Sequence, residues 1–236
     1  RGRTVVAQLS LRWGNESTKA GRATACSIAS AMLMRGTTRR SREDIANEFN
    51  RLRANVGIGT EGGSLDTVRE NLPDTLRLVA EILRHPAFPE AEFRQLRQAS
   101  LASLESQRGD PAALAAIELV RHLNPWPPEH WYYNATLDER IERLTSLSLE
   151  EVRRCYDDFM GASQGELAMV GDFDPEEVTG LLTELLGNWP SPASYARIPV
   201  RIFPSSPLSR QIETPDKANA TLRAGMVLPL RDDDPD

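Results

Sequence analysis

The sequence predicts an α+β domain in which helices pack on an antiparallel sheet. Short stretches of alternating apolar and polar residues, typical of half-buried strands, occur near the N-terminus, as a central pair and again late in the chain. Stretches with helical apolar spacing lie between them in groups, so strands and helices do not alternate one by one. No glycine-rich phosphate loop follows a strand, which excludes a doubly wound nucleotide-binding fold.

The first predicted strand is 5–13, in which every second residue is apolar. A turn at Gly14 and Asn15 leads into a helix of small residues that ends near Gly36. Because so many of its side chains are small, this helix fits a closely packed position.

A second helix is expected from Ser41, which has Asp44 three residues later as in a capping box, to about Leu52. Two short strands, 55–60 and 64–69, then flank Gly62 and Gly63, which is a hairpin signal. Five more helices and two more strands follow. The helices are 73–83, 90–107, 111–119, 148–159 and 176–186, and the strands are 166–170 and 218–228.

These elements predict three parts of the chain. Residues 1–187 form an α+β repeat, residues 188–213 form a linker rich in Pro and Ser, and residues 214–236 supply the first strand of a following, truncated repeat. Because strand patterns lie directly beside both ends of the sequence, we expect it to be a piece of a longer protein.

Composition narrows the possible functions. The chain has 236 residues and a net charge of −6, so a nucleic-acid partner, which requires a basic face, is not expected. No apolar run is long enough to span a bilayer. Two cysteines, Cys26 and Cys155, do not make a disulfide framework, and both are predicted to be thiols in the core.

The helix that follows the first strand carries the most informative pattern. Its segment Met32–Thr37, with the sequence MLMRGT, resembles the end of the signature helix of the pitrilysin/insulinase family of zinc peptidases. In that family the sequence His-x-x-Glu-His comes immediately before it. Here the corresponding residues 27–31 read SIASA.

The resemblance implies which functions have been lost. Two His residues four apart share one helix face and bind one zinc ion, and the Glu between them acts as general base. Ser27 and Ala31 offer no imidazole, and Ser30 cannot replace the carboxylate. The third ligand position aligns with Ser103, or with Glu105 if the alignment shifts by two residues. A lone Glu105 would not bind zinc, so this chain is expected to have no catalytic residues and no metal site.

The resemblance extends in order along nearly the whole chain, most clearly at 71–83, 144–152, 167–174 and 214–220. It implies a metallohydrolase-like repeat of the type found in pitrilysin and mitochondrial processing peptidase. Family members place such repeats in two halves around a closed chamber, and only one half carries zinc. This chain resembles the zinc-free half, most closely the third repeat of bacterial single-chain members.

The implied partners are a zinc-bearing half, in the same chain or in a separate subunit, and a peptide substrate. Zinc is expected in that partner half, and the resemblance favours a periplasmic over a cytoplasmic location. An alternative role is a structural, core-type scaffold subunit with no part in proteolysis. A cryptic hydrolase that uses Cys155 or a histidine is a further alternative.

A loop rich in Pro and aromatic residues gives a separate hypothesis. Three of its side chains could contact an extended peptide or a partner: Trp126, Trp131 and Tyr132. A metal site formed by His122, Glu129 and His130 is disfavoured, because a Pro-rich loop does not fix ligand geometry. An ordinary packed loop is the simplest alternative.

Overall fold

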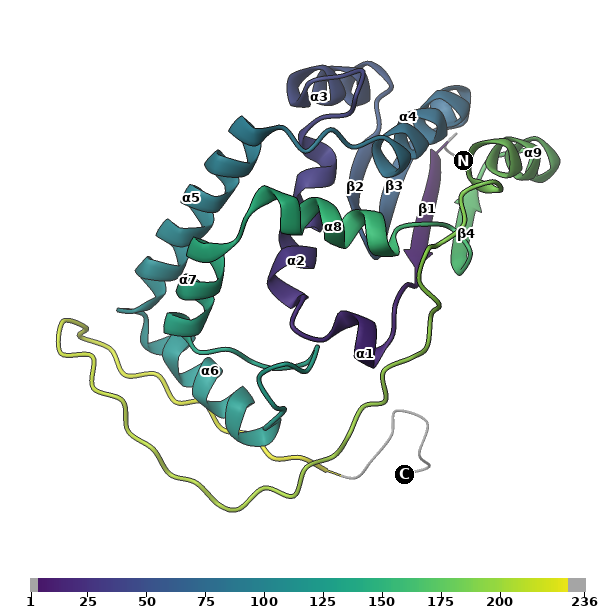
Figure 1. Cartoon of the computed structure of the whole chain (residues 1–236). Helices are drawn as coiled ribbons and strands as arrows, with labels where there is room; N and C mark the ends of the chain where they lie inside the picture. Colours follow the sequence, from purple (N-terminus) through teal and green to yellow (C-terminus); the bar gives the residue numbers. More distant parts are fainter. Residues whose placement is uncertain (1–3, 229–236) are drawn as a thin grey trace.

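The computed structural model describes residues 4–228 and confirms the α+β fold. Four strands form one antiparallel sheet in the order β2-β3-β1-β4. They are β1 (Thr4–Leu11), β2 (Asn55–Gly59), β3 (Gly62–Val68) and β4 (Gly165–Gly171). The hairpin β2–β3 therefore lies at one edge and the late strand β4 at the other (Figure 1).

Some helices pack beside the sheet and others extend away from it as a curved arm (Figure 1). None of those among residues 4–228 is long and apolar enough to cross a membrane. Their bounds are α1 (Glu16–Lys19), α2 (Ala23–Met32), α3 (Arg42–Arg51), α4 (Leu72–Arg84), α5 (Glu90–Gln107), α6 (Pro111–Leu123), α7 (Leu137–Ser146), α8 (Leu149–Phe159) and α9 (Pro175–Leu186). Two short 3-10 helices lie at Leu33–Arg35 and Arg69–Asn71.

The two faces of the sheet differ in burial. On β1 the apolar residues Val5, Ala7, Leu9 and Leu11 are buried, as the alternating pattern predicts. On the opposite face the side chains of all four strands are exposed or half-exposed, so this face is uncovered in the described part of the chain. Its exposed residues are mostly small or polar: Thr4, Val6, Gln8, Asn55, Gly57, Ser64, Asp66, Glu166, Ala168 and Val170.

The predicted position of the hairpin turn is wrong. β2 ends at Gly59 and β3 begins at Gly62, so the turn is Thr60–Glu61, and the two glycines lie inside β3. Gly62 has φ +114°, and a Cβ there would lie 2.1 Å from the carbonyl oxygen of Leu9. Gly62 is thus required by the close approach of β3 to β1, and Gly63 by that of β3 to β2, where a Cβ would lie 2.0 Å from the carbonyl oxygen of Gly57.

Two helices, α1 and α7, are absent from the sequence-based prediction. Both have capping boxes, formed by Asn15 with Thr18 and by Thr136 with Glu139. The second pattern, Thr followed three residues later by Glu, was a readable signal. The first helix has only four residues, which is too short for any apolar period.

The predicted strand 218–228 does not form. Those residues lie outside any helix or strand and follow the outside of the arm near α6 (Figure 1). Leu222 and Met226 remain largely exposed. A strand needs a neighbour to pair its backbone groups, and no described strand lies beside this segment. The domain boundaries at 187 and 213 stay predictions, and residues 229–236 lie outside the described range.

Candidate functional site

The helix that carries the degenerate motif, α2, divides its side chains between a buried and an exposed face. Cys26, Ala29 and Met32 are buried in the core, whereas Ser27 and Ala31 are exposed. The two exposed residues are four apart and therefore share one face of the helix. Ser27 and Ala31, which the resemblance aligns with the family's two His ligands, thus lie together on an exposed face, and the alignment itself stays a prediction.

The side chains on this face do not fit a zinc ion. A methyl group cannot coordinate metal, and a neutral hydroxyl is not among the ligands from which zinc sites are built. Among residues 4–228 no group of three or more His, Cys, Asp or Glu side chains lies close enough together to hold a metal ion.

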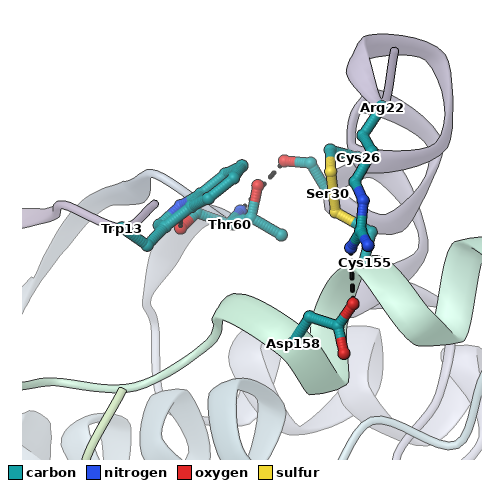
Figure 2. Close-up of a disulfide and its surroundings, with 7 residues drawn as sticks. All are labelled: Trp13, Arg22, Cys26, Ser30, Thr60, Cys155 and Asp158. Carbon is teal, nitrogen blue, oxygen red and sulfur yellow. Dashed lines mark hydrogen bonds and ion pairs between the residues drawn. A yellow bond between two sulfur atoms is a disulfide. The ribbon is translucent and has the colours of Figure 1, made fainter. Parts of the chain in front are cut away.

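Ser30, which the resemblance aligns with the general base, has a structural role. Its Oγ accepts a hydrogen bond of 3.0 Å from the backbone N–H of Thr60 in the hairpin turn (Figure 2). A Cβ at Gly59 would lie only 2.3 Å from this Oγ. The side chain of Ser30 therefore fills the space against the hairpin and satisfies a backbone donor there.

The same turn is held from its other side by Trp13. The indole Nε1–H donates a hydrogen bond of 2.8 Å to the carbonyl oxygen of Thr60. The ring is buried and packs against Phe159 and Trp131, at centroid distances of 5.0 and 5.7 Å. The hairpin turn is thus fixed by two side chains from different elements.

A disulfide joins the motif helix to α8 and corrects the prediction of two free thiols. Cys26 and Cys155 have Cα atoms 5.4 Å apart and both are buried, as expected, but they are bonded to each other (Figure 2). They are 129 residues apart in the sequence, so no local spacing pairs them. The bond leaves Cys155 without the free thiol that a cryptic hydrolase would need.

An ion pair reinforces this link one turn away. Arg22 Nη1 lies 2.5 Å from Asp158 Oδ2, and the guanidinium also lies over the ring of Phe159 at 5.3 Å. Both charged side chains are partly exposed, so their contribution is smaller than that of the disulfide. Together the contacts fix the N-terminal half of α2 on α8.

Two titratable groups beside this region have shifted pKa values. Burial between the rings of Trp13 and Trp131 lowers the pKa of Lys19, while the carboxylate of Glu61 opposes that shift. Burial raises the pKa of Tyr156, whose hydroxyl donates a 2.6 Å hydrogen bond to the carbonyl oxygen of Leu83. Both side chains serve packing, and neither faces Ser27 or Ala31 in the described contacts.

The predicted third-ligand position lies on α5, which packs along α7, whereas α2 packs on α8. Ser103 and Glu105 are both exposed. The carboxylate of Glu105 pairs with Arg108 at 2.6 Å within the same helix. The structure therefore gives neither residue a partner on α2, and the alignment of Ser103 with the ligand position stays a prediction.

The aromatic loop is more deeply packed than a peptide-binding surface requires. Trp126 is buried, Trp131 packs edge-on against Trp13, and only Tyr132 is exposed. Contact of these residues with a peptide or a partner stays a prediction. Sequence reasoning missed the residues that cover Trp126, because they come from the distant linker.

We expect purified chain to contain far less than one zinc ion per molecule after dialysis. The reason is the chemistry of Ser27, Ala31 and Ser103, none of which is a zinc ligand. Elemental analysis by mass spectrometry measures the ratio, with a zinc-binding protein of known stoichiometry dialysed in parallel. One tightly held zinc per chain would contradict the assignment of this helix as metal-free.

One family model matches the later part of the chain. Residues 146–236 match the family model described as the peptidase M16 inactive domain. No curated protein matches the sequence. This match confirms the resemblance to the non-catalytic half of pitrilysin-family peptidases, and similar solved structures show the same fold.

Three such structures are informative. A peptidase M16 inactive domain from Pseudomonas fluorescens is 18% identical with a TM-score of 0.66, and the match covers 87% of this chain and 49% of that one. A protease from Helicobacter pylori is 14% identical with a TM-score of 0.65, and the match covers 85% of this chain and 48% of that one. The ferredoxin protease FusC, solved in complex with Arabidopsis ferredoxin, is 16% identical with a TM-score of 0.58. That match covers 83% of this chain and 22% of the protease. The chain thus spans about half the length of the first two proteins and 22% of the third.

Proposed function

We propose that this chain is the non-catalytic domain of a pitrilysin-family zinc peptidase, which completes the peptide-enclosing chamber and docks the zinc-bearing half. The observation that carries the proposal is the motif helix α2. It is retained as a rigid element with its ligand face exposed, yet the side chains on that face cannot bind metal.

The way in which α2 is held supports this role. The disulfide Cys26–Cys155 and the hydrogen bond from Thr60 to Ser30 fix the helix although it has no metal to position. A fixed helix whose exposed side chains are small suits a structural position in a chamber wall better than a catalytic one. The uncovered sheet face, with its small and polar side chains, is a second surface suited to line a water-filled chamber.

A wall of this kind can affect the rate without contacting the metal. Enclosure orders a flexible peptide and limits the water around the reacting bond, so part of the entropic cost is met before the chemical step. Long peptides contact more of the wall than short ones do. Removing space from the wall should therefore affect long substrates most.

The disulfide also supports a location for the parent protein. Disulfides form and persist in oxidising compartments and are rare where glutathione keeps thiols reduced. The bond between Cys26 and Cys155 therefore favours the periplasm, or another oxidising space, over the cytoplasm.

The function is tested by enlarging the exposed face of α2 in the parent assembly. Ala31→Trp should reduce cleavage of long peptides by about tenfold or more and leave short peptides within about twofold, because a bulky ring intrudes on enclosed space. Ala31 is exposed, so the overpacking cost of a buried helix does not arise. The measurement is kcat/KM on substrates of increasing length.

The matched control is Ala46→Trp, an exposed alanine on α3, which should leave both substrates unchanged. Equal losses on long and short peptides with Ala31→Trp, or equal losses with the two variants, would remove the case for a chamber wall. An assembly with no peptidase activity would favour the scaffold alternative.

A further inference from the structure

The linker predicted at 188–213 follows a defined path across the domain. The backbone N–H of Ala196 donates a 3.0 Å hydrogen bond to the carbonyl oxygen of Gly14, between β1 and α1. The side-chain amide of Asn15 donates to the carbonyl oxygen of Ser194 at 3.3 Å. The linker is therefore joined to the turn that connects β1 with α1.

Beyond this point the linker packs on the aromatic loop. Trp126 and His130 stack with parallel rings at 3.8 Å, and the ring of Phe203 meets Trp126 edge-on at 4.8 Å. Ile198 is also buried, whereas the neighbouring Val200 and Ile202 are 74% and 58% exposed. The linker thus places selected side chains on the loop and points others into solvent, as a docked extended segment does.

Charged groups converge at the same place. His130 accepts a hydrogen bond on Nδ1 from the backbone N–H of Tyr132 at 3.1 Å, so the neutral ring carries its proton on Nε2. This buried Nε2 has no hydrogen-bond partner, and Glu16 Oε1 lies 3.4 Å away from it. Arg201 Nη2 of the linker lies 3.9 Å from the same oxygen. Glu16 therefore stands between a loop donor and a linker cation.

The path continues along α6. His122 Nε2 lies 2.8 Å from the carbonyl oxygen of Ser206, and Arg210 pairs with Glu118 at 2.6 Å. The linker therefore contacts the domain at several separate points between Ala196 and Arg210, and not at one point only.

We propose that Glu16, Trp126 and His130 form a docking surface for the linker. We call this three-residue surface the clasp. Its occupant is the chain's own segment 196–206, recognised by the ring of Phe203 and the guanidinium of Arg201. This inference rests on the proposed function only in that the linker leads toward a following repeat. The clasp directs the linker onto α6, which it follows as far as Arg210.

Hydrogen exchange on the full chain tests the clasp without any peptidase assay. Phe203→Ala should increase the exchange rate of the Ala196 amide by about 5–30-fold, because losing one buried aromatic contact raises the open population by that order. Ile202→Ala, on the exposed neighbour, should leave the rate unchanged. Amides of β1 should keep their protection in both variants, which shows that the domain remains folded.

A second pair tests the charge contact on side chains that do not enter the core. Arg201→Gln should increase exchange at Ala196 by about two- to fivefold, as expected for a partly exposed ion pair, whereas Arg197→Gln should not. Equal exchange in Phe203→Ala and Ile202→Ala, or no effect of Arg201→Gln, would overturn the clasp. Neither result bears on the chamber-wall proposal, so the two can fail separately.

Discussion

Removal of the Cys26–Cys155 bond is expected to destabilise the folded chain by about 2–5 kcal/mol. The bond closes a loop of more than a hundred residues, and cross-linking so long a loop restricts the unfolded chain strongly. For a protein of this size the melting temperature should fall by on the order of 10 °C. Thermal unfolding followed by circular dichroism, with and without reductant, measures the change.

The double variant Cys26→Ala/Cys155→Ala separates the bond from other effects of reductant. Oxidised wild-type chain should melt well above the variant, and reductant should bring wild type down to about the level of the variant while leaving the variant itself unaffected. Mass spectrometry of alkylated wild type supplies the covalent check. A chain purified from an oxidising compartment with two alkylated cysteines would show that the bond does not form.

Truncation of Trp13 is expected to have a similarly large effect. Trp13→Ala removes a fully buried ring from between Phe159 and Trp131, and such substitutions cost about 3–5 kcal/mol. It also removes the donor to the carbonyl oxygen of Thr60, which fixes the hairpin turn. Urea unfolding at constant temperature gives the difference in free energy.

Trp13→Phe distinguishes packing from hydrogen bonding. It keeps an aromatic ring and loses the Nε1–H donor, so we expect a smaller cost of about 1–3 kcal/mol. Hydrogen exchange in the β2–β3 turn should increase in both variants. A Trp13→Phe chain nearly as stable as wild type, with unchanged exchange in the turn, would mean that packing of the ring alone matters and that the hydrogen bond contributes little.

Local patterns were sufficient to predict most of the fold. Alternation predicted β1, proline and amphipathic spacing predicted α4 and α9, and the capping residues Ser41 and Ser148 marked the starts of α3 and α8. These features depend on residues close together in the chain. The start of the family pattern at residues 27–37 lies on a helix, α2, as expected, and the assignment of Ser27, Ser30 and Ala31 to the lost ligands and base stays a prediction.

Features that depend on distant residues were not predictable. The disulfide, the seating of Ser30 under Thr60 and the contact of Phe203 with Trp126 each join segments that the sequence gives no reason to pair. Gly62 suggested a turn because glycine permits both a turn and a close strand approach, and only the position of β1 decides between them. The predicted strand 218–228 shows the converse, since strand propensity without a neighbour does not produce a sheet.

The contact between Ser30 and Gly59 makes the identities of these two positions conditional on each other. The hydroxyl of Ser30 occupies the space into which any side chain at position 59 would extend. It also accepts a hydrogen bond from the backbone N–H of Thr60, the residue that follows Gly59. A substitution at Gly59 is therefore costly while Ser30 is present, and a larger residue at position 30 is costly while the hairpin keeps its path. Among descendants of this chain the two positions should covary, and a carboxylate at position 30 would require an earlier, compensating change in the hairpin.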